Sequence, residues 1–207
     1  MTKALKIGLT GGIACGKTVI SNAFKNLGVP VIDTEEISRE VTAKNSPLLD
    51  KLAKAFGQSI ITKEGLLDRR ALRLIVFNDK SGENLNKLNS IMLKAIIDRL
   101  LEIYDKQTAP YVIFVIPLLF EHHLEHLCDR VLVIDVNEKT QLERLQTRDK
   151  IDLNTALGML KSQVDRKTRR QKADDLIETD ALSIEKRLHS VLKLHEKYLD
   201  LANRVNH

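Results

Sequence analysis

GLTGGIACGKT, at residues 8–18, contains the pattern G-x-x-x-x-G-K-[ST] between Gly11 and Thr18. A strand-like run precedes this pattern at residues 5–10, and apolar residues at helical spacing follow it at residues 19–27. In such a context glycines let the backbone curl so that successive N–H groups point inward, and the following helix adds the positive end of its dipole. The stretch therefore predicts a loop that binds the phosphates of a nucleoside triphosphate such as ATP.

The residues of this loop have separate expected roles. Lys17 is expected to bridge the β- and γ-phosphates, the Thr18 hydroxyl to ligate Mg²⁺, and the Val19 amide to reach the α-phosphate. A cysteine beside a lysine and a helix N-terminus can be reactive, but we favour the interpretation that the Cys15 side chain points away from the nucleotide. The residues expected to contact the nucleotide are Gly11, Gly12, Ile13, Ala14, Cys15, Gly16, Lys17, Thr18 and Val19.

The rest of the chain alternates strand-like and helix-like segments. Short apolar runs predict strands at residues 5–10, 30–33, 111–116, 130–136 and 176–177. The continuous β-branched run at 111–116 is typical of a strand buried on both faces of a parallel sheet. Helical patterns lie between the runs, so the expected fold class is α/β, a P-loop nucleoside triphosphate hydrolase-type parallel sheet flanked by helices.

Between Asp33 and Ala109 the pattern becomes helical, with helices expected at 48–56, 71–77 and 85–104 and a strand-like pair at Ile60 and Ile61. We expect a single domain over residues 1–207. Its core would comprise about 1–33 and 109–207, with a helical acceptor-binding insertion at about 34–108 and a small helical lid at about 138–172. The amphipathic tail at 184–205 is predicted to pack back on the core.

Composition limits the classes of function. The chain of 207 residues has 43% hydrophobic and 29% charged residues, which indicates a globular protein rather than a disordered one. Its two cysteines cannot form a disulfide framework, and it has no apolar run of membrane-spanning length and no signal-peptide pattern. We expect a cytoplasmic protein without a membrane partner, as a monomer or weak homo-oligomer.

The positive charge is concentrated in one segment. The net charge is +5, and the stretch from Lys139 to Lys172 holds ten basic and four acidic residues. A high pI suggests nucleic-acid binding, but a local cationic segment also suits the charge that develops in phosphoryl transfer. Arg144 and Arg148, spaced i,i+4, share one helix face there and are the expected catalytic lid arginines. The low aromatic content of 4% offers few stacking platforms for a nucleic acid, and none is expected as a partner.

A kinase also needs a group that accepts the proton of the acceptor hydroxyl. Asp33 and Asp135 both end strand-like runs, and the carboxyl ends of parallel strands meet at one edge of the sheet. Periodicity alone does not separate the two; Asp33 is favoured because it opens the insertion. A small-molecule kinase is the simplest interpretation, because a guanine-reading N-K-x-D string and a second motor motif are not found in the sequence.

Several motifs, in order, resemble those of the dephospho-CoA kinases. They are the phosphate loop, VIDTEEISRE (31–40), DRRALRLIVF (68–77), VIPLLFE (115–121), RVLVIDV (130–136), QLERLQTRD (141–149) and SQVDRKTRRQKADDLI (162–177). The resemblance covers residues 5 to about 180. It implies transfer of the ATP γ-phosphoryl to the ribose 3′-hydroxyl of dephospho-CoA, the last step of coenzyme A synthesis. Another small-molecule or nucleoside monophosphate kinase is the alternative, and an ATP-dependent nucleic-acid-binding protein the second.

The resemblance also implies roles for single residues. Asp33 matches the family's catalytic aspartate, and Arg144 and Arg148 match its lid arginines. Arg169 matches a position that meets phosphates. The positions matched around the acceptor are Asp33, Glu35, Arg39, Arg69, Pro117, Leu118 and Glu121, with Glu35 in place of a second aspartate.

The chain also departs from the family pattern. Ala14 and Cys15 replace Gly-Ser, and Leu93 and Lys94 replace His-Pro. The sequence Thr179-Asp180-Ala181 replaces an Asn-x-Gly turn near the adenine.

Overall fold

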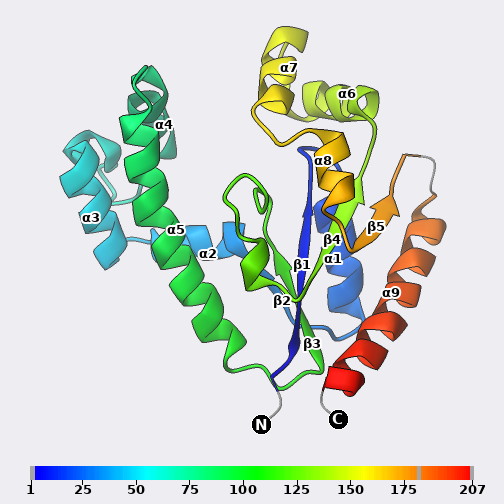
Figure 1. The fold of residues 1–207 in the computed structure, drawn as a ribbon. Helices are drawn as coiled ribbons and strands as arrows, with labels where there is room; N and C mark the ends of the chain where they lie inside the picture. Colours follow the sequence, from blue (N-terminus) through cyan, green and yellow to red (C-terminus); the bar gives the residue numbers. More distant parts are fainter. Residues whose placement is uncertain (1–2, 181–182, 206–207) are drawn as a thin grey trace. The chain divides into compact units, whose positions relative to one another are not determined.

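A computed structural model of the chain describes residues 3–180 and 183–205. The chain divides into two compact units. The first comprises the residues up to Asp33 and from Gln107 onward, and the second comprises Thr34–Lys106. Figure 1 shows the elements of both units in sequence colours.

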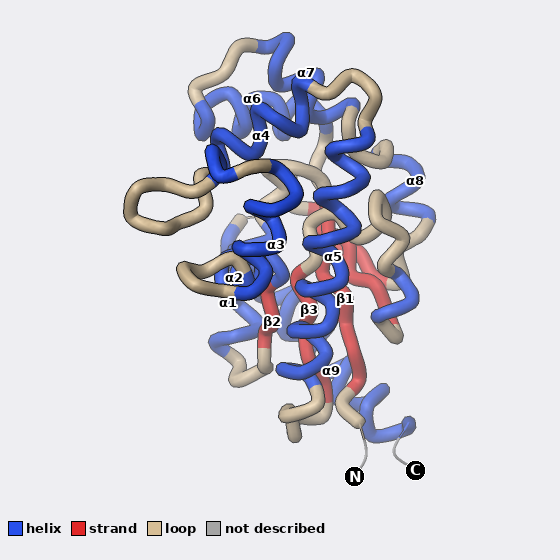
Figure 2. Tube along the Cα trace, turned by 90° about the vertical axis from the view of Figure 1, so that its left-hand side faces the viewer, coloured by secondary structure: helices blue, strands red, loops and turns tan. Residues whose placement is uncertain are grey.

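The first unit is built on a parallel sheet. Its strands are β1 (Leu5–Gly11), β2 (Val31–Asp33), β3 (Tyr111–Val115), β4 (Arg130–Asp135) and β5 (Asp175–Glu178). They are ordered β2-β3-β1-β4-β5, and all four pairings are parallel. Figure 2 shows β2, β3 and β1 running side by side. This arrangement confirms the predicted fold class, and strands form at all five predicted places.

The helices of the first unit flank this sheet. They are α1 (Lys17–Asn26), α6 (Glu138–Asp149), α7 (Leu153–Lys161), α8 (Arg166–Gln171) and α9 (Ile184–Val205), with a 3₁₀ turn η2 (Glu125–Leu127). Helices α1 and α9 contact each other, and α9 also contacts β1 and β3, so both cover one face of the sheet. Helix α6 lies beyond the carboxyl end of β4, and α8 contacts β4 (Figure 1).

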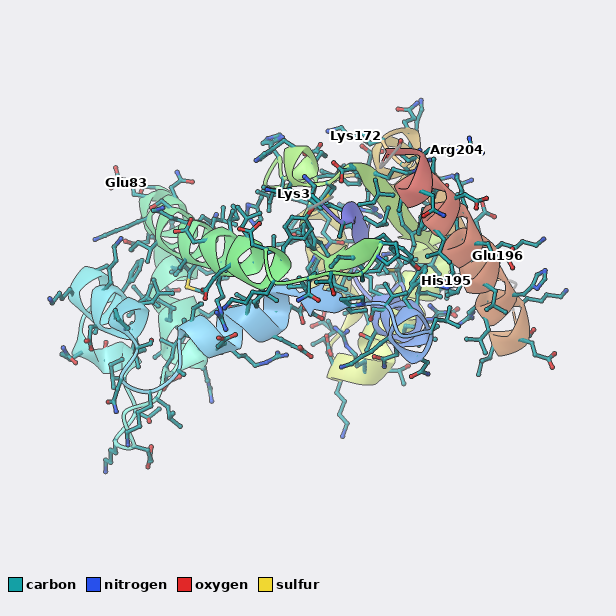
Figure 3. All side chains as sticks on the ribbon, turned by 90° about the horizontal axis from the view of Figure 1, so that it is seen from below. Lys3, Glu83, Lys172, His195, Glu196 and Arg204 are labelled. Atoms are coloured by element: carbon teal, nitrogen blue, oxygen red, sulfur yellow. The ribbon has the colours of Figure 1, made fainter. Side chains whose placement is uncertain are left out.

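The amphipathic tail packs on the sheet as predicted. Val191, Tyr198 and Ala202 of α9 are buried in the core of the first unit, together with Phe24 of α1. His195, labelled in Figure 3, lies with its Nδ1 2.6 Å from the hydroxyl oxygen of Tyr111. A polar contact thus accompanies the apolar face of α9 where it meets β3.

The second unit is helical, with α2 (Thr34–Val41), α3 (Pro47–Phe56), the 3₁₀ helix η1 (Gln58–Ile60), α4 (Arg69–Asn78) and α5 (Glu83–Tyr104). The side chain of Ser46 caps α3 and that of Asp68 caps α4. Its core consists of Leu52, Phe56, Ile60, Leu72, Val76 and Ile91. The strand-like pair Ile60 and Ile61 does not form a strand: Ile60 ends η1, and Ile61 makes only an isolated antiparallel bridge with Leu67. Among the described residues, no helix is both long enough and apolar enough to cross a membrane.

Candidate active site

The phosphate loop connects β1 to α1. Strand β1 ends at Gly11 and α1 begins at Lys17, with Gly16 as its N-cap in the left-handed region at φ 94°. Ala14 also has a positive φ, of 57°, where a residue with a Cβ is under strain. Ala14, which replaces the family's glycine, thus holds a backbone conformation that favours glycine.

The charged and hydroxyl groups of the loop have defined positions. The Lys17 ammonium folds back over the loop and donates to the carbonyl oxygens of Gly11 and Gly12, at 2.9 and 3.2 Å. Thr18 is exposed in the first turn of α1. The Val19 amide donates to the Gly16 carbonyl at 3.1 Å. Cys15 is 1% exposed and belongs to the hydrophobic core, in agreement with a side chain that points away from a nucleotide.

The lid segment contacts the loop directly. Gln141 Nε2 of α6 donates to the Ile13 carbonyl at 2.7 Å, and the Ile13 amide donates to Gln163 Oε1 at 2.8 Å. A Cβ at Gly12 would come within 2.4 Å of Gln141 Nε2 and 2.8 Å of Arg169 Nη2, so the ends of these two side chains would have to shift. The backbone of the loop is therefore held from outside by side chains of the predicted lid.

The two lid arginines differ in their surroundings. Arg144 Nη1 donates to the Ala14 carbonyl at 3.3 Å and so lies against the loop. Arg148 forms a bidentate ion pair with Asp149, with Nε–Oδ1 and Nη2–Oδ2 distances of 2.7 and 2.9 Å. Arg169 is buried, and its Nη1 donates to the Val164 carbonyl.

Much of the segment's positive charge is already paired within the protein. Arg166 and Arg170 bind the Asp135 carboxylate, and Lys172 pairs with Glu125 at 2.7 Å. Together with the Arg148–Asp149 pair, these contacts leave a smaller cationic surface than the sequence count suggests.

The two candidate aspartates lie in different environments. Asp33 ends β2, where it is in register with Val115 of β3, and Val115 is in turn in register with Leu9 of β1. Asp33 therefore lies at the sheet edge where the phosphate loop begins, about 10 Å across two strand spacings from β1. It is half-buried.

Asp135 is buried and accepts from Arg166 Nε and Nη2, at 2.9 and 2.7 Å, and from Arg170. Burial favours the neutral acid, but the hydrogen bonds and charges of the two guanidinium groups outweigh it and lower the pKa of Asp135. A carboxylate held in this way is a poor proton acceptor. Asp33 remains the predicted base, as the resemblance implies.

The VIPLLFE segment follows β3. The Pro117 carbonyl accepts from the Thr10 hydroxyl at 3.3 Å, and Leu118 is exposed. Glu121 Oε1 accepts from the Val164 amide at 2.9 Å, which ties the segment to the connection before α8. A predicted acceptor-binding residue, Glu121, therefore also has a structural contact with the lid segment.

The remaining predicted acceptor residues belong to the second unit. Glu35 lies in the first turn of α2 and Arg39 in its last turn. Arg69, the first residue of α4, donates to the Thr42 hydroxyl at 2.8 Å and to the Ser38 carbonyl at 3.4 Å. Burial, and then the positive charge of Arg39, lower the pKa of Arg69. Two guanidinium groups are thus brought close together, an arrangement that suits an anion.

Comparison with known proteins decides the family. The model of the dephospho-CoA kinase family matches residues 5–185. The chain belongs to the dephospho-CoA kinase family. Curated dephospho-CoA kinases of Mannheimia succiniciproducens and Haemophilus ducreyi are 45% and 43% identical to it. These alignments cover 96% and 97% of this chain, and 93% and 98% of the relatives.

Solved structures agree with this assignment to the dephospho-CoA kinases. The Campylobacter jejuni dephospho-CoA kinase is 30% identical, with a TM-score of 0.70 over 94% of this chain and 97% of that one. The Thermus thermophilus protein TT1252 has a TM-score of 0.81 at 26% identity, over 94% of this chain and 97% of that one. A shikimate kinase of Bacteroides thetaiotaomicron, 16% identical with a TM-score of 0.51 over 93% and 98% of the two chains, shares the fold.

Sequence reasoning missed the residues that hold the loop from outside. Gln141 and Gln163 stand within the quoted motifs but received no role. Thr179 was expected only as part of a turn near the adenine, and no role was assigned to its side chain, which is buried against the carbonyls of Cys15 and Asp135. Ala181, the third residue of that departure, lies outside the described residues. The available signal was Gln141, a polar residue at a buried position of a helix.

Proposed function

We propose that this chain transfers the γ-phosphoryl group of ATP to the ribose 3′-hydroxyl of dephospho-CoA, giving coenzyme A and ADP. The observation that carries the proposal is the family match over residues 5–185. It is supported by the position of the phosphate loop and Asp33 at one edge of the sheet. Membership in the family makes the chain a kinase with ATP and a small-molecule acceptor as substrates.

In the proposed step the bond from the γ-phosphorus to the bridging oxygen of ADP breaks, and a bond from the γ-phosphorus to the 3′-oxygen forms. The proton of the 3′-hydroxyl passes to the Asp33 carboxylate, and ADP leaves. The transferred group carries spread negative charge through a loose transition state, so positioning and electrostatics supply most of the rate. Asp33 contributes by orienting the hydroxyl and accepting its proton.

The loop and the lid supply the positive groups. The backbone amides of the loop and the N-terminus of α1 would bind the phosphate oxygens. The Ile13 amide is excepted because it donates to Gln163, and the Val19 amide would first leave the Gly16 carbonyl. Lys17 would leave its contacts with the Gly11 and Gly12 carbonyls and bind the β- and γ-phosphates. Arg144, which lies against the loop, is assigned to the γ-phosphate, and Arg148 to the same charge after it leaves Asp149.

The residues present suit Mg²⁺. The exposed Thr18 hydroxyl in the first turn of α1 would supply one ligand, because Mg²⁺ keeps several waters and takes most other ligands from substrate phosphates. When bound, the ion neutralises charge on the β- and γ-phosphate oxygens.

From the second unit we assign Glu35, Arg39 and Arg69 to the acceptor, because the adjacent charges of Arg39 and Arg69 suit its phosphates. From the first unit we assign Pro117 and Glu121, which are half-buried, and Leu118, which is exposed. Since Arg69 is fixed by Thr42 and Ser38, it is preorganised for contact with those phosphates.

A panel of acceptors tests the proposal. ADP release from ATP and Mg²⁺ is measured with dephospho-CoA, with AMP, with shikimate and without an acceptor. We expect fast release with dephospho-CoA only, and loss of that release in the Lys17→Ala variant. Release that is faster with another acceptor, or equally fast without one, contradicts the proposed substrate.

A further inference from the structure

Two buried side chains outside the loop hold two of its carbonyl oxygens. Gln141 Nε2 donates to the Ile13 carbonyl at 2.7 Å, and the Thr179 hydroxyl donates to the Cys15 carbonyl at 3.2 Å. Gln141 and Thr179 are each 1% exposed. One comes from α6 and the other from the residue after β5, so the loop is fixed from two separate elements of the first unit.

Because the peptide group is planar and trans, a hydrogen bond that fixes a carbonyl also fixes the direction of the next residue's N–H. A carbonyl and the N–H of the next residue lie in one plane and point in opposite directions. Holding the Ile13 carbonyl toward Gln141 therefore turns the Ala14 N–H to the opposite side. Holding the Cys15 carbonyl toward Thr179 does the same for the Gly16 N–H.

The Thr179 hydroxyl has one proton to donate. The Asp135 carbonyl also lies 3.2 Å from this hydroxyl, but it already accepts from the Thr179 amide at 2.9 Å. The Cys15 carbonyl is therefore the acceptor for which the hydroxyl is needed. The position of Thr179 is itself fixed, because Arg187 donates to its carbonyl at 2.8 Å.

Gln141 is equally constrained. Its amide group lies close to Gly12, where a Cβ would come within 2.4 Å of Nε2 and displace it. The Ile13 amide, on the other side of the same residue, is held by Gln163 at 2.8 Å. The two bonds hold consecutive peptide groups: Gln163 holds the Gly12–Ile13 peptide through its N–H, and Gln141 holds the Ile13–Ala14 peptide through its carbonyl.

We propose that Gln141 and Thr179 are positioning residues for ATP: they hold the Ile13 and Cys15 carbonyls outward and so aim the Ala14 and Gly16 amides at the phosphates. This inference rests on the proposed function, since it assumes that the loop binds ATP. According to this proposal, the lid helix α6 and the residue after β5 together align the Ala14 and Gly16 amides of the loop. Two aligned donors need not reorganise when the phosphates arrive.

The test uses the full chain and the variants Thr179→Val, Thr179→Ser and Gln141→Met, with Thr147→Val as matched control. Thr147 is exposed, and its hydroxyl bonds to the Glu143 carbonyl within α6, 2.8 Å away. ATP dissociation constants are measured by calorimetry, and circular dichroism establishes that each variant is folded. KM for ATP and kcat are then measured with dephospho-CoA.

We expect Thr179→Val and Gln141→Met each to raise Kd and KM for ATP about three- to tenfold, the effect of one lost hydrogen bond. We expect kcat to change less than Kd and KM for ATP do. Thr179→Ser, which keeps the hydroxyl, should restore wild-type affinity, and Thr147→Val should leave it unchanged. A purely structural tie would lower the melting temperature without raising Kd in the folded variant.

A folded Thr179→Val or Gln141→Met protein that binds ATP within about 1.5-fold of the wild type overturns the inference. If Thr179→Val does not fold, Gln141→Met decides by the same criterion. A wild-type chain that does not bind ATP contradicts the proposed function instead, so the two failures are distinguishable.

Discussion

Replacing Asp135 by asparagine should destabilise the protein much more than the same replacement at Asp149. The Asp135 carboxylate is 3% exposed and is bound by Arg166 and Arg170, whose side chains are 33% and 37% exposed. Removing one partner of a fully buried pair costs about 3–5 kcal/mol, whereas exposed pairs contribute about 0–1 kcal/mol. Because water reaches both guanidinium groups, we expect an intermediate loss of about 2 kcal/mol.

Asp149 provides the matched control. It also binds an arginine through two hydrogen bonds, but both Asp149 and Arg148 are more exposed than Asp135. We expect Asp149→Asn to change the free energy of unfolding far less than Asp135→Asn does, because water screens the exposed pair. Urea titration followed by circular dichroism gives the free energy of unfolding of the wild type and both variants.

The pH dependence gives the reasoning a second test. The pKa of Asp135 is lowered in the folded state, so its contribution is complete above the unfolded value of about 3.9 and is lost as the pH falls through the folded value. The difference between wild type and Asp135→Asn should therefore be constant near neutral pH and shrink in acid below about pH 4. A variant within about 0.5 kcal/mol of wild type at pH 7, or a difference that grows in acid, would refute the reasoning.

Three further predictions concern the base, a thiol and the second unit. Asp33→Asn should lower kcat by about 10²–10⁴-fold while the ATP Kd from calorimetry changes little, because the carboxylate acts on the acceptor hydroxyl; near-normal kcat would exclude it as the base. Burial, and then the charge of Asp129, raise the pKa of the Cys128 thiol to about 12, so the folded protein should not be alkylated there at pH 8 in a peptide-mapping experiment, and rapid native labelling would contradict this. Leu52→Ala, at a fully buried position, should destabilise by about 2–5 kcal/mol in urea, and a loss below about 1 kcal/mol would show that the core is looser than its burial indicates.

The fold class could be predicted from the sequence because the strongest patterns in this chain are local. The apolar run at 111–116 and the glycine-rich turn at 11–16 each identify an element without reference to the rest of the chain. The pair Ile60 and Ile61 misled for the same reason: two β-branched residues suit a strand, but here Ile60 fills the helical core of the second unit. Tertiary packing overrode local preference at that point.

The candidate site was predictable only where the chemistry is encoded by neighbours in the chain. The loop from Gly11 to Thr18 is such a case. The Asp135 ion pairs join residues 31 and 35 positions apart, and the bond from Thr179 to Cys15 spans 164 positions. Sequence spacing does not predict contacts between residues so far apart in the chain. The partners of the buried Asp135 carboxylate and the buried Thr179 hydroxyl could therefore be identified only from the structure.

The central claim, that this chain phosphorylates the ribose 3′-hydroxyl of dephospho-CoA, is tested most directly by the structure of the product. The purified chain is incubated with ATP, Mg²⁺ and dephospho-CoA, and the product is analysed by phosphorus and proton nuclear magnetic resonance. We predict one new phosphomonoester, coupled to the ribose 3′-proton and identical with authentic coenzyme A. A phosphate at another hydroxyl, or unchanged dephospho-CoA in the presence of active, ATP-binding protein, would contradict the account.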